Sequence, residues 1–394
     1  LYIIDFLSIR LFKMQWNIPE VPATLVPEVK NKWGKPWMWA ATLAFACCCS
    51  LLWILLLKKY AIYSLVFPVI WFAALSYRYI SSVHRYAAME AWQKEKDNIR
   101  RKWTEWAGKR VSVIDAYVAL PSEIALNDVI AETKGNERFD CIAFIDEEDN
   151  FERPLCHETA VWQLEERMRS LAEFSKKLTV HIHTPDNDIY EAWQNKLINM
   201  SETIGIENLD LTIMPLQDMS GFIDNWFEKS EPEGIHAVLS AWLNPDVDDL
   251  EFTETVTWIV FSSLHLAKQN NLPIRAWVQR PITLDDGKQP QLLKKYVDYG
   301  LHGEAVDAVW FASSHEEIQQ YMDGIKAAGG DWHYDRNSIL RHNPGLFMGP
   351  LASENQLLML GLAVENTEQK NQLFGWNTDN GFYMGRLIQA YGNV

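Results

Sequence analysis

Two uncharged apolar stretches near the amino end constrain the fold of this chain more than any other feature. Residues 37–57 contain no charge, residues 60–77 contain none either, and Lys58 and Lys59 stand between them. At a rise of about 1.5 Å per residue, each stretch can cross a hydrocarbon layer of roughly 30 Å. A charge at the bilayer centre costs about 2.5–3.5 kcal/mol. We therefore predict a hairpin of two membrane-spanning helices over residues 37–77, with both lysines at the far membrane surface.

The basic residues beside the two stretches predict their orientation, because lysine and arginine are retained on the cytoplasmic side of a membrane. They flank the stretches at Lys30, Lys32, Lys35, Arg78, Arg85, Lys94, Lys96, Arg100, Arg101 and Lys102. We expect residues 1–36 and the chain after residue 77 to be cytoplasmic. The alternative is a single span, with the other stretch in the interface and the rest of the chain outside. Met14 is a candidate start of the protein.

Residues 78–107 contain no proline or glycine and are rich in helix-forming residues. Tyr79, Val83 and Tyr86 recur at helical spacing, and Gly108 is a typical residue after a helix end. We predict a helical stalk that continues the second span. Two interpretations of its basic character stay open: a solvated face near anionic lipid headgroups, or a dedicated binding helix.

The charge is distributed unevenly along the chain. Residues 1–106 hold 14 basic and 7 acidic residues, a net charge of +7, which leaves 22 basic and 45 acidic residues, a net charge of −23, for the remainder. So acidic a body repels phosphate backbones, which disfavours binding of nucleic acid. It also repels anionic lipid, so we expect membrane contact through residues 37–77 alone.

After residue 108, short β-rich runs alternate with helical patterns. The runs "LTVHIHT", "IHAVLSAWL" and "TVTWIVFSS" are typical of buried strands, whereas "ETAVWQLEERMRSLAEFSKKL" and "HEEIQQYMDGIKAAGG" repeat apolar residues at helical spacing. The alternation predicts an α/β fold with helical layers over a mostly buried sheet. The polar stretch 282–291 predicts a boundary between a first part, 108–285, and a second part, 286–394.

Three predicted strands share a residue pattern. The segments "FDCIAFIDEED", "IHAVLSAWLNPD" and "VDAVWFASSHEE" are each apolar and end in acidic or amide residues. Two interpretations stay open: an internal duplication with two similar halves, or the ordinary composition of buried strands.

The sequence contains no familiar catalytic motif, neither a nucleophile elbow, nor a phosphate-binding loop, nor a metalloprotease helix. The segment "LCHE" places Cys156 beside His157, and a cysteine nucleophile needs a base to form its thiolate. Adjacent residues on a strand point to opposite faces, so a packed cysteine at a helix entry is the competing interpretation. Cys141 is the other cysteine of the body, and no spacing predicts a disulfide framework or a zinc site.

The segment "HIHT" places His181 and His183 on one face of a strand, which is half of a metal site. Asp186 and Asp188 follow and could supply carboxylates, but they are equally well placed to cap the next helix. Histidines hydrogen-bonded at a strand end are therefore the competing interpretation.

The last 21 residues, 374–394, are rich in glycine, asparagine and aromatic residues, with Trp376 among the latter. A disordered terminus would be polar and would carry few aromatic residues. Either this segment docks on the body, or it offers aromatic anchors to another protein.

The chain resembles the lipase adaptors of the bacterial type VI secretion system over roughly residues 100–394. The resemblance rests on the apolar stretches followed by "RRKWTEWAGKRVSVIDAYVALP", on "AVLSAWLNPD" and on "ETVTWIVFSSLHLAKQNNLPIRAWVQRPI". In that family a strand of the last type runs into a W-x-x-R-P element, matched here by Trp277, Arg280 and Pro281. The residue pattern of the predicted strands is also similar to that of thiolase-like folds, although the chain lacks the small-residue cysteine elbow of those enzymes.

The resemblance implies a membrane-anchored, non-catalytic adaptor and chaperone at the bacterial inner membrane, without cofactor or metal. Its implied partners are a phospholipase effector and the secretion spike protein that carries the effector. The candidate contact residues are Cys156, His157, His181, His183, Trp277, Arg280 and Trp376. The alternative function is a membrane-bound hydrolase or transferase with an unrecognised site around the cysteine and histidines of that set. A third, an immunity protein against a lipase, requires a body outside the cytoplasm.

Overall fold

A computed structural model describes residues 16, 36–56, 66–131, 140–144, 156–175, 177–214, 219–228, 234–244, 250–284, 289–312, 315–330, 340–352, 355–379 and 381–390. The chain divides into two compact units. The first, here called the body, comprises Leu1–Ile18 and Thr104–Val394. The second, here called the helical unit, comprises Pro19–Trp103.

The body is built on a mixed sheet, in which ten strands are formed by the described residues. They lie in the order β3-β2-β4-β5-β1-β6-β10-β9-β7-β8. Their bounds are β1 (Arg110–Ala119), β2 (Lys177–His183), β3 (Asn208–Ile213), β4 (Ile235–Trp242), β5 (Thr255–Ser262), β6 (Ala276–Leu284), β7 (Ala308–Ala312), β8 (Leu340–His342), β9 (Asn371–Thr378) and β10 (Gly381–Gln389). The predicted α/β class is thereby confirmed.

The sheet consists of two halves with the same topology, β1–β5 and β6–β10. In each half the strands follow one another across the sheet in the order third, second, fourth, fifth, first. In each half the fifth strand is antiparallel to the first and the fourth, and the second is parallel to the third and the fourth. This is an internal duplication. The halves meet between Ser262 and Ala276 instead of near residue 285, because β6, which ends at Leu284, is already the first strand of the second half.

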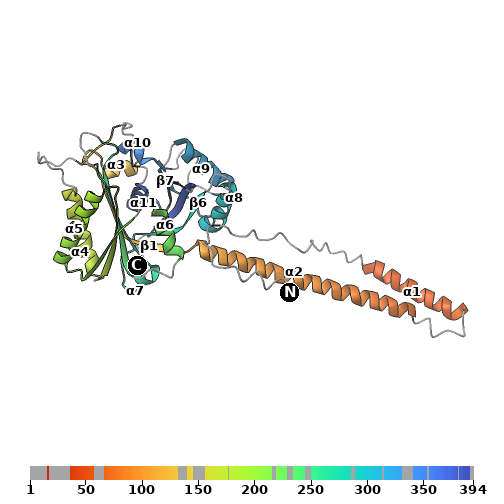
Figure 1. The fold of residues 1–394 in the computed structure, drawn as a ribbon. Helices are drawn as coiled ribbons and strands as arrows, with labels where there is room; N and C mark the ends of the chain where they lie inside the picture. The colour runs from red at the N-terminus through yellow and green to blue at the C-terminus, as the bar shows by residue number, and fades with distance from the viewer. Residues whose placement is uncertain are drawn as a thin grey trace. The chain divides into compact units, whose positions relative to one another are not determined.

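Helices cover both faces of the sheet. They are α3 (Leu126–Ala131), α4 (Glu158–Ala172), α5 (Asn187–Ile204), α6 (Met219–Glu228), α7 (Leu264–Gln269), α8 (Gln289–Lys295), the π-helix η3 (Tyr296–Leu301), α9 (His315–Ala327), α10 (Pro344–Met348) and α11 (Gln356–Glu365). Helices α4 and α5 form one hydrophobic core with one face of the first half. Helices α6 and α11 belong to a second core on the opposite face (Figure 1).

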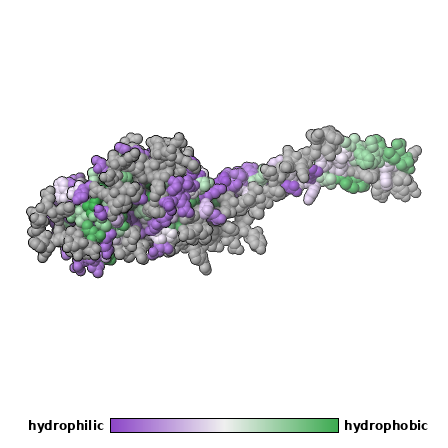
Figure 2. Space-filling view, turned by 90° about the horizontal axis from the view of Figure 1, so that it is seen from above, coloured by the Kyte–Doolittle hydropathy of each residue, from purple (hydrophilic) through white to green (hydrophobic). Residues whose placement is uncertain are grey.

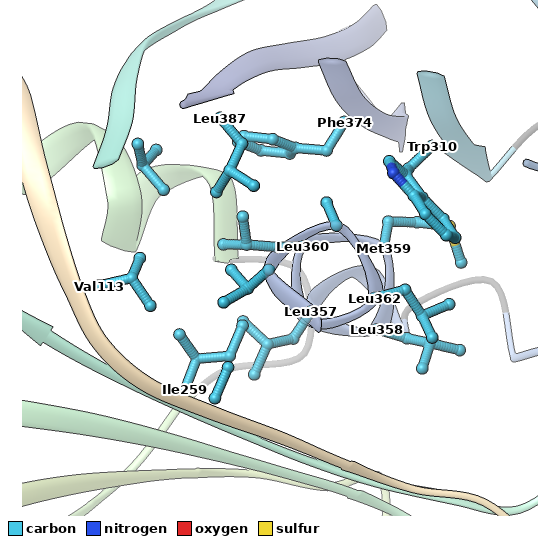
Figure 3. Close-up of a cluster of buried hydrophobic side chains, with 14 of the residues drawn as sticks. Val113, Ile259, Trp310, Leu357, Leu358, Met359, Leu360, Leu362, Phe374 and Leu387 are labelled. Atoms are coloured by element: carbon cyan, nitrogen blue, oxygen red, sulfur yellow. The ribbon is translucent and has the colours of Figure 1, made fainter. Parts of the chain in front are cut away.

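Helix α11 is the centre of the second core. Its sequence, QLLMLGLAVE, is apolar on all sides, and the residues from Gln356 to Val364 are all buried. A helix that is apolar all round has to be covered on every side. Both halves of the sheet supply the cover, as Figure 3 shows for Val113 and Ile259 of the first half and Trp310, Phe374 and Leu387 of the second.

The helical unit contains α1 (Pro36–Leu56) and most of α2 (Val66–Ala107). In the described part of the chain, one helical window, Trp39–Leu56, is long and apolar enough to cross a membrane, and none of it is buried. Exposed apolar side chains continue on α2 at Val66, Val69, Ile70 and Phe72. Figure 2 shows apolar residues gathered at one end of the unit. The predicted stalk, residues 78–107, is helical, whereas Lys58 and Lys59 lie outside the described residues.

The predicted strand "FDCIAFID" is not formed in its described part, Cys141–Phe144. Side chains that precede β5 bind its backbone instead. The Ile142 amide donates to Thr253 Oγ1 (3.2 Å), and the Phe144 amide donates to Glu254 Oε2 (2.8 Å). These donors are therefore satisfied outside the sheet, and the apolar run forms a loop.

The substitution Gly361→Ala should lower the free energy of unfolding of the body by about 1–3 kcal/mol, because it overpacks the second core. A Cβ atom at this position of α11 would lie 2.8 Å from Thr257 Cγ2 and 2.9 Å from Val118 Cγ2, on two strands of the sheet. Urea unfolding of the full chain in detergent measures the change.

Gly324→Ala in α9 is the matched control. The added Cβ atom would meet only Leu293 Cδ1, at 2.8 Å, which is the movable end of a side chain. Alanine is favoured over glycine within a helix by about 1 kcal/mol, so this variant should be neutral or more stable. Equal unfolding free energies for the two variants would contradict the tight packing of α11.

Candidate functional site

A threonine and two histidines from three strands form a hydrogen-bonded row on one face of the first half. Thr212 Oγ1 lies 2.6 Å from His181 Nδ1, and His181 Nε2 lies 3.2 Å from His236 Nδ1. The strand register explains the row. Thr212 of β3 stands directly opposite His181 of β2, whereas His236 of β4 stands opposite Thr179, two residues earlier. We call Thr212, His181 and His236 the hydroxyl–imidazole cluster.

Aromatic residues of α6 cover the cluster. The Phe222 ring lies edge-on to His181, with 4.8 Å between the centroids, and the Trp226 ring lies edge-on to His236 at 5.0 Å. The two imidazole planes are nearly parallel, with an interplanar angle of 8°. All three cluster residues remain half-buried, so the cluster is shielded by α6 without being closed to solvent.

The cluster lies where two adjacent parallel strands end. Thr212 is the penultimate residue of β3, and His181 stands two residues before the end of β2. The chain continues from β2 into α5 and from β3 into α6, and these helices belong to cores on opposite faces of the sheet. In open α/β sheets, such a reversal at the carboxyl ends of strands is the usual place for a ligand crevice.

Electrostatics keep His181 neutral. Burial, and to a smaller extent the neighbouring His236, lower the pKa of His181 to about 4, whereas Asp210 opposes the shift. A neutral imidazole carries one donor and one acceptor nitrogen. Two arrangements satisfy the row: either Thr212 donates to His181 and His181 donates to His236, or both bonds run in the opposite direction.

His183, the second histidine of the "HIHT" segment, has separate partners. Its Nδ1 atom lies 3.0 Å from Ser240 Oγ, which also accepts a hydrogen bond from Trp242 Nε1 (2.9 Å). Asp186 caps α5 by accepting from the backbone amides of Asp188 and Ile189. The described residues contain no cluster of three or more potential metal ligands. The two histidines therefore share a face, but different hydroxyl groups hold them.

Cys156 and His157 are not arranged as a nucleophile and its base. Cys156 packs against the core formed by α4 and α5, whereas the His157 ring stacks on Phe144, with 4.3 Å between centroids. Burial raises the pKa of the Cys156 thiol to about 11, and Lys196 opposes the shift only in part. The side chain is therefore a protonated thiol at neutral pH, which is a poor nucleophile.

The W-x-x-R-P element connects several parts of the body. The Arg110 guanidinium lies 5.9 Å from the Trp277 ring centroid, and Arg280 lies 4.1 Å from that of Trp106. Arg280 Nη2 also donates to the Phe227 carbonyl oxygen (2.7 Å), which ties β6 to the end of α6. Arg280 is 5% exposed, so its contacts with the body leave little of it accessible to a partner.

The carboxyl-terminal segment is a β-hairpin of the sheet, formed by β9 and β10. Trp376 is fully buried and stacks on Phe374 and Tyr383, with centroids 5.6 Å and 4.9 Å apart. Of the two interpretations of this segment, docking on the body is the one that the structure shows. Trp376 therefore stabilises the second core.

Sequence reasoning identified His181 but missed Thr212 and His236. The "HIHT" segment drew attention to one strand, whereas the partners of His181 lie 31 and 55 residues away along the chain. The available signal was weak. Thr212 and His236 each stand among mostly apolar residues, in the segments "LDLTIMPL" and "IHAVLSAWL", and nothing in either segment points to the other.

No known family profile and no curated protein matches this sequence. Among solved structures, a ketosynthase from module 6 of the bacillaene synthase of Bacillus subtilis 168 matches with a TM-score of 0.50 at 9% identity, covering 72% of this chain and 71% of that chain. A ketosynthase from module 1 of the bacillaene synthase of Bacillus amyloliquefaciens FZB42 gives a TM-score of 0.48 at 11% identity, covering 74% and 77%. The body therefore has a thiolase-like, ketosynthase-type fold.

The structural neighbour with a TM-score of 0.50 is a ketosynthase, and this finding contradicts the prediction of a non-catalytic secretion adaptor and chaperone. That prediction rested on the resemblance to the adaptor family, and the absence of a familiar catalytic motif agreed with it. A site assembled from three strands leaves no such motif. The resemblance to the secretion family, the phospholipase and spike partners, and the inner-membrane location are tested by none of these comparisons and stay predictions. At such low identity the likeness establishes the fold, so the chemistry has to be argued from the residues.

The His181 imidazole should titrate near pH 4 in the folded chain, because burial disfavours its charged form. NMR of protein containing 13C-labelled histidine measures the titration, and His181→Asn assigns the signal. The urea-unfolded chain is the control, with an expected midpoint near the ordinary value of about 6.5. A His181 midpoint near 6.5 in the folded chain would contradict the burial effect.

The Cys156 thiol should react slowly with iodoacetamide at pH 8, because only about one thiol in a thousand is ionised when the pKa is about 11. A variant with alanine at the other four cysteines isolates the reaction. The rate should increase about tenfold per pH unit between pH 8 and pH 10, and unfolding in urea should accelerate it about 100-fold at pH 8. Equal rates in the folded and unfolded chain would show that the thiol is activated.

Proposed function

We propose that this protein is a membrane-anchored acyl-transfer enzyme, a hydrolase or transferase that uses Thr212 as its nucleophile and His181 as the base. The observation that carries the proposal is the 2.6 Å approach of Thr212 Oγ1 to His181 Nδ1 beside an imidazole that burial keeps unprotonated. A hydroxyl group is a weak nucleophile until a neighbouring base removes its proton. A nucleophile, a base and a third group that orients the base are the parts of such a site, and the hydroxyl–imidazole cluster contains all three.

His236 is the orienting group in this proposal. For His181 Nδ1 to accept the hydroxyl proton, its Nε2 atom has to carry the other proton. The 3.2 Å contact between His181 Nε2 and His236 Nδ1 provides an acceptor for that proton. The nearly parallel imidazole planes, at 8° to each other, suit such a bond. In this proposal His236 Nδ1 is the acceptor, and it holds His181 in the tautomer that can act as a base.

The reaction has two steps. Thr212 Oγ attacks the acyl carbonyl carbon, the hydroxyl proton passes to His181 Nδ1, and the bond to the leaving group breaks as that group takes the proton from His181. An acyl ester of Thr212 results. In the second step, water or another nucleophile loses its proton to His181 and attacks the ester, which returns the threonine hydroxyl and releases a free acid or a new acyl product.

Acyl thioesters are the proposed substrate class. The solved structure that matches this chain with a TM-score of 0.50 is a ketosynthase. The half-buried position of the cluster at the carboxyl ends of β2 and β3 supports a site that a flexible acyl carrier can reach. The apolar helical unit supports placement of this activity at a membrane.

Thr212→Val and His181→Gln should each lower kcat by about 10²–10⁴-fold, because each removes one partner of the proton transfer. The assay uses the full chain in detergent with acetyl and decanoyl thioesters of N-acetylcysteamine, and measures the released thiol. Thr212→Ser keeps a hydroxyl group and should retain activity. Mass spectrometry of acid-quenched samples should show an acyl adduct on residue 212 of the wild type and of Thr212→Ser.

Thr257→Val is the matched control, since Thr257 is a fully buried strand threonine whose hydroxyl has no hydrogen-bond partner among the described residues. It should leave kcat unchanged. No thiol release by the wild type with either thioester, or full activity of Thr212→Val without an adduct, would overturn the proposal.

A further inference from the structure

We propose that the helical unit crosses a lipid bilayer twice, as a hairpin whose two ends emerge beside each other on the side of the membrane where the body lies. The contacts of two tryptophans carry this inference. Trp16 precedes the helical unit and Trp106 follows it, and both belong to the body. Neither contact depends on the enzymatic activity proposed above.

Trp16 is clamped in the body. Its side chain is 5% exposed, and its Nε1 atom donates to the Pro281 carbonyl oxygen (2.6 Å). The ring lies edge-on to Tyr296, with 5.3 Å between centroids. Gly300 allows this approach, because a Cβ atom there would lie 3.2 Å from Trp16 Cη2. The chain therefore leaves the body from a fixed point.

The chain re-enters the body at the same point. The Trp106 ring lies edge-on to Trp16, with 5.4 Å between centroids, and Arg280 stacks on Trp106. Ala107 is fully buried, and its carbonyl oxygen accepts a hydrogen bond from Gln279 Nε2 (3.1 Å). A hydrocarbon layer is roughly 30 Å thick, so two points in ring contact lie on one side of it. The segment between them has to cross an even number of times.

Contacts within the helical unit indicate two crossings. Trp71 Nε1 donates to Thr42 Oγ1 (3.1 Å), the Trp39 and Trp71 rings lie 6.5 Å apart, and Arg78 lies 5.0 Å from the Trp39 ring centroid. Later residues of α2 thus meet earlier residues of α1, as in an antiparallel pair. The apolar start of α2 therefore runs beside the spanning window of α1, and both expose apolar side chains.

The charges that flank the helical pair indicate which lipid headgroups it meets. Basic residues stand at both ends of the pair, from Lys30 to Lys35 and from Arg78 to Lys102, whereas the body is acidic. Each basic residue near an anionic membrane surface contributes about 1 kcal/mol of attraction. The occupant of the apolar surface is therefore a bilayer with anionic headgroups on the side of the body, and the body itself stands off that surface.

Accessibility of single cysteines tests the topology in the full chain. The five natural cysteines are replaced by alanine, and one reporter is introduced as Lys35→Cys, Lys59→Cys or Lys109→Cys. Spheroplasts of an expressing bacterium are treated with a membrane-impermeant maleimide, before and after lysis. Only the reporter at position 59 should react before lysis, and all three should react afterwards.

Three results would overturn the proposal. Protection of all three reporters before lysis would show a hairpin that lies on the inner surface without crossing. Labelling at position 35 without labelling at position 109, or the reverse, would show an odd number of crossings. If a reporter does not react after lysis, the same sample is labelled again after denaturation. A reporter at position 59 that reacts only in the denatured protein would lie inside folded protein instead of at the far surface.

Discussion

The burial of α11 is the constraint on which the rest of the body depends. A ten-residue helix with apolar side chains in every direction cannot rest on one sheet face, as an amphipathic helix does. It needs cover from two sides, and the two halves of the sheet provide it. The glycine of this helix sets how closely the first half approaches, through Thr257 and Val118. The duplication is therefore a physical requirement of this core as well as a regularity of topology.

Equivalent strand positions in the two halves carry hydrogen bonds between different kinds of side chain. In the first half, His181 of β2 bonds to His236, which stands two residues before the direct partner of His181 on β4. In the second half, Trp310 of β7 donates to Gln372 (2.6 Å), which stands two residues before the direct partner of Trp310 on β9. The diagonal bond is thus a feature of the fold. In the second half it lies fully buried, whereas in the first it lies half-buried and joins two titratable groups.

The sequence predicted the elements better than their assembly. Apolar runs such as "TVTWIVFSS" identify strands because β5 is buried along its whole length, and the pattern records that burial. The strands β9 and β10 were not predicted, because their glycines and asparagines are typical of loops. In the structure, Gly375 and Gly385 leave the space that the rings of Phe382 and Phe374 occupy. The candidate site shows the same limit. "HIHT" predicts which face His181 occupies, but strand order decides which residues lie beside it, and no local pattern encodes strand order.

The clamp at Trp16 has a consequence for biosynthesis. The Trp16 side chain leaves the ribosome before Pro281, the acceptor of its hydrogen bond, which follows 265 residues later. At about 5–20 residues per second, the interval is on the order of tens of seconds. The apolar segments that follow Trp16 become available to a membrane long before the clamp can close. If the proposed hairpin inserts during synthesis, insertion precedes closure, and the clamp then ties together two chain segments whose side of the membrane has already been decided.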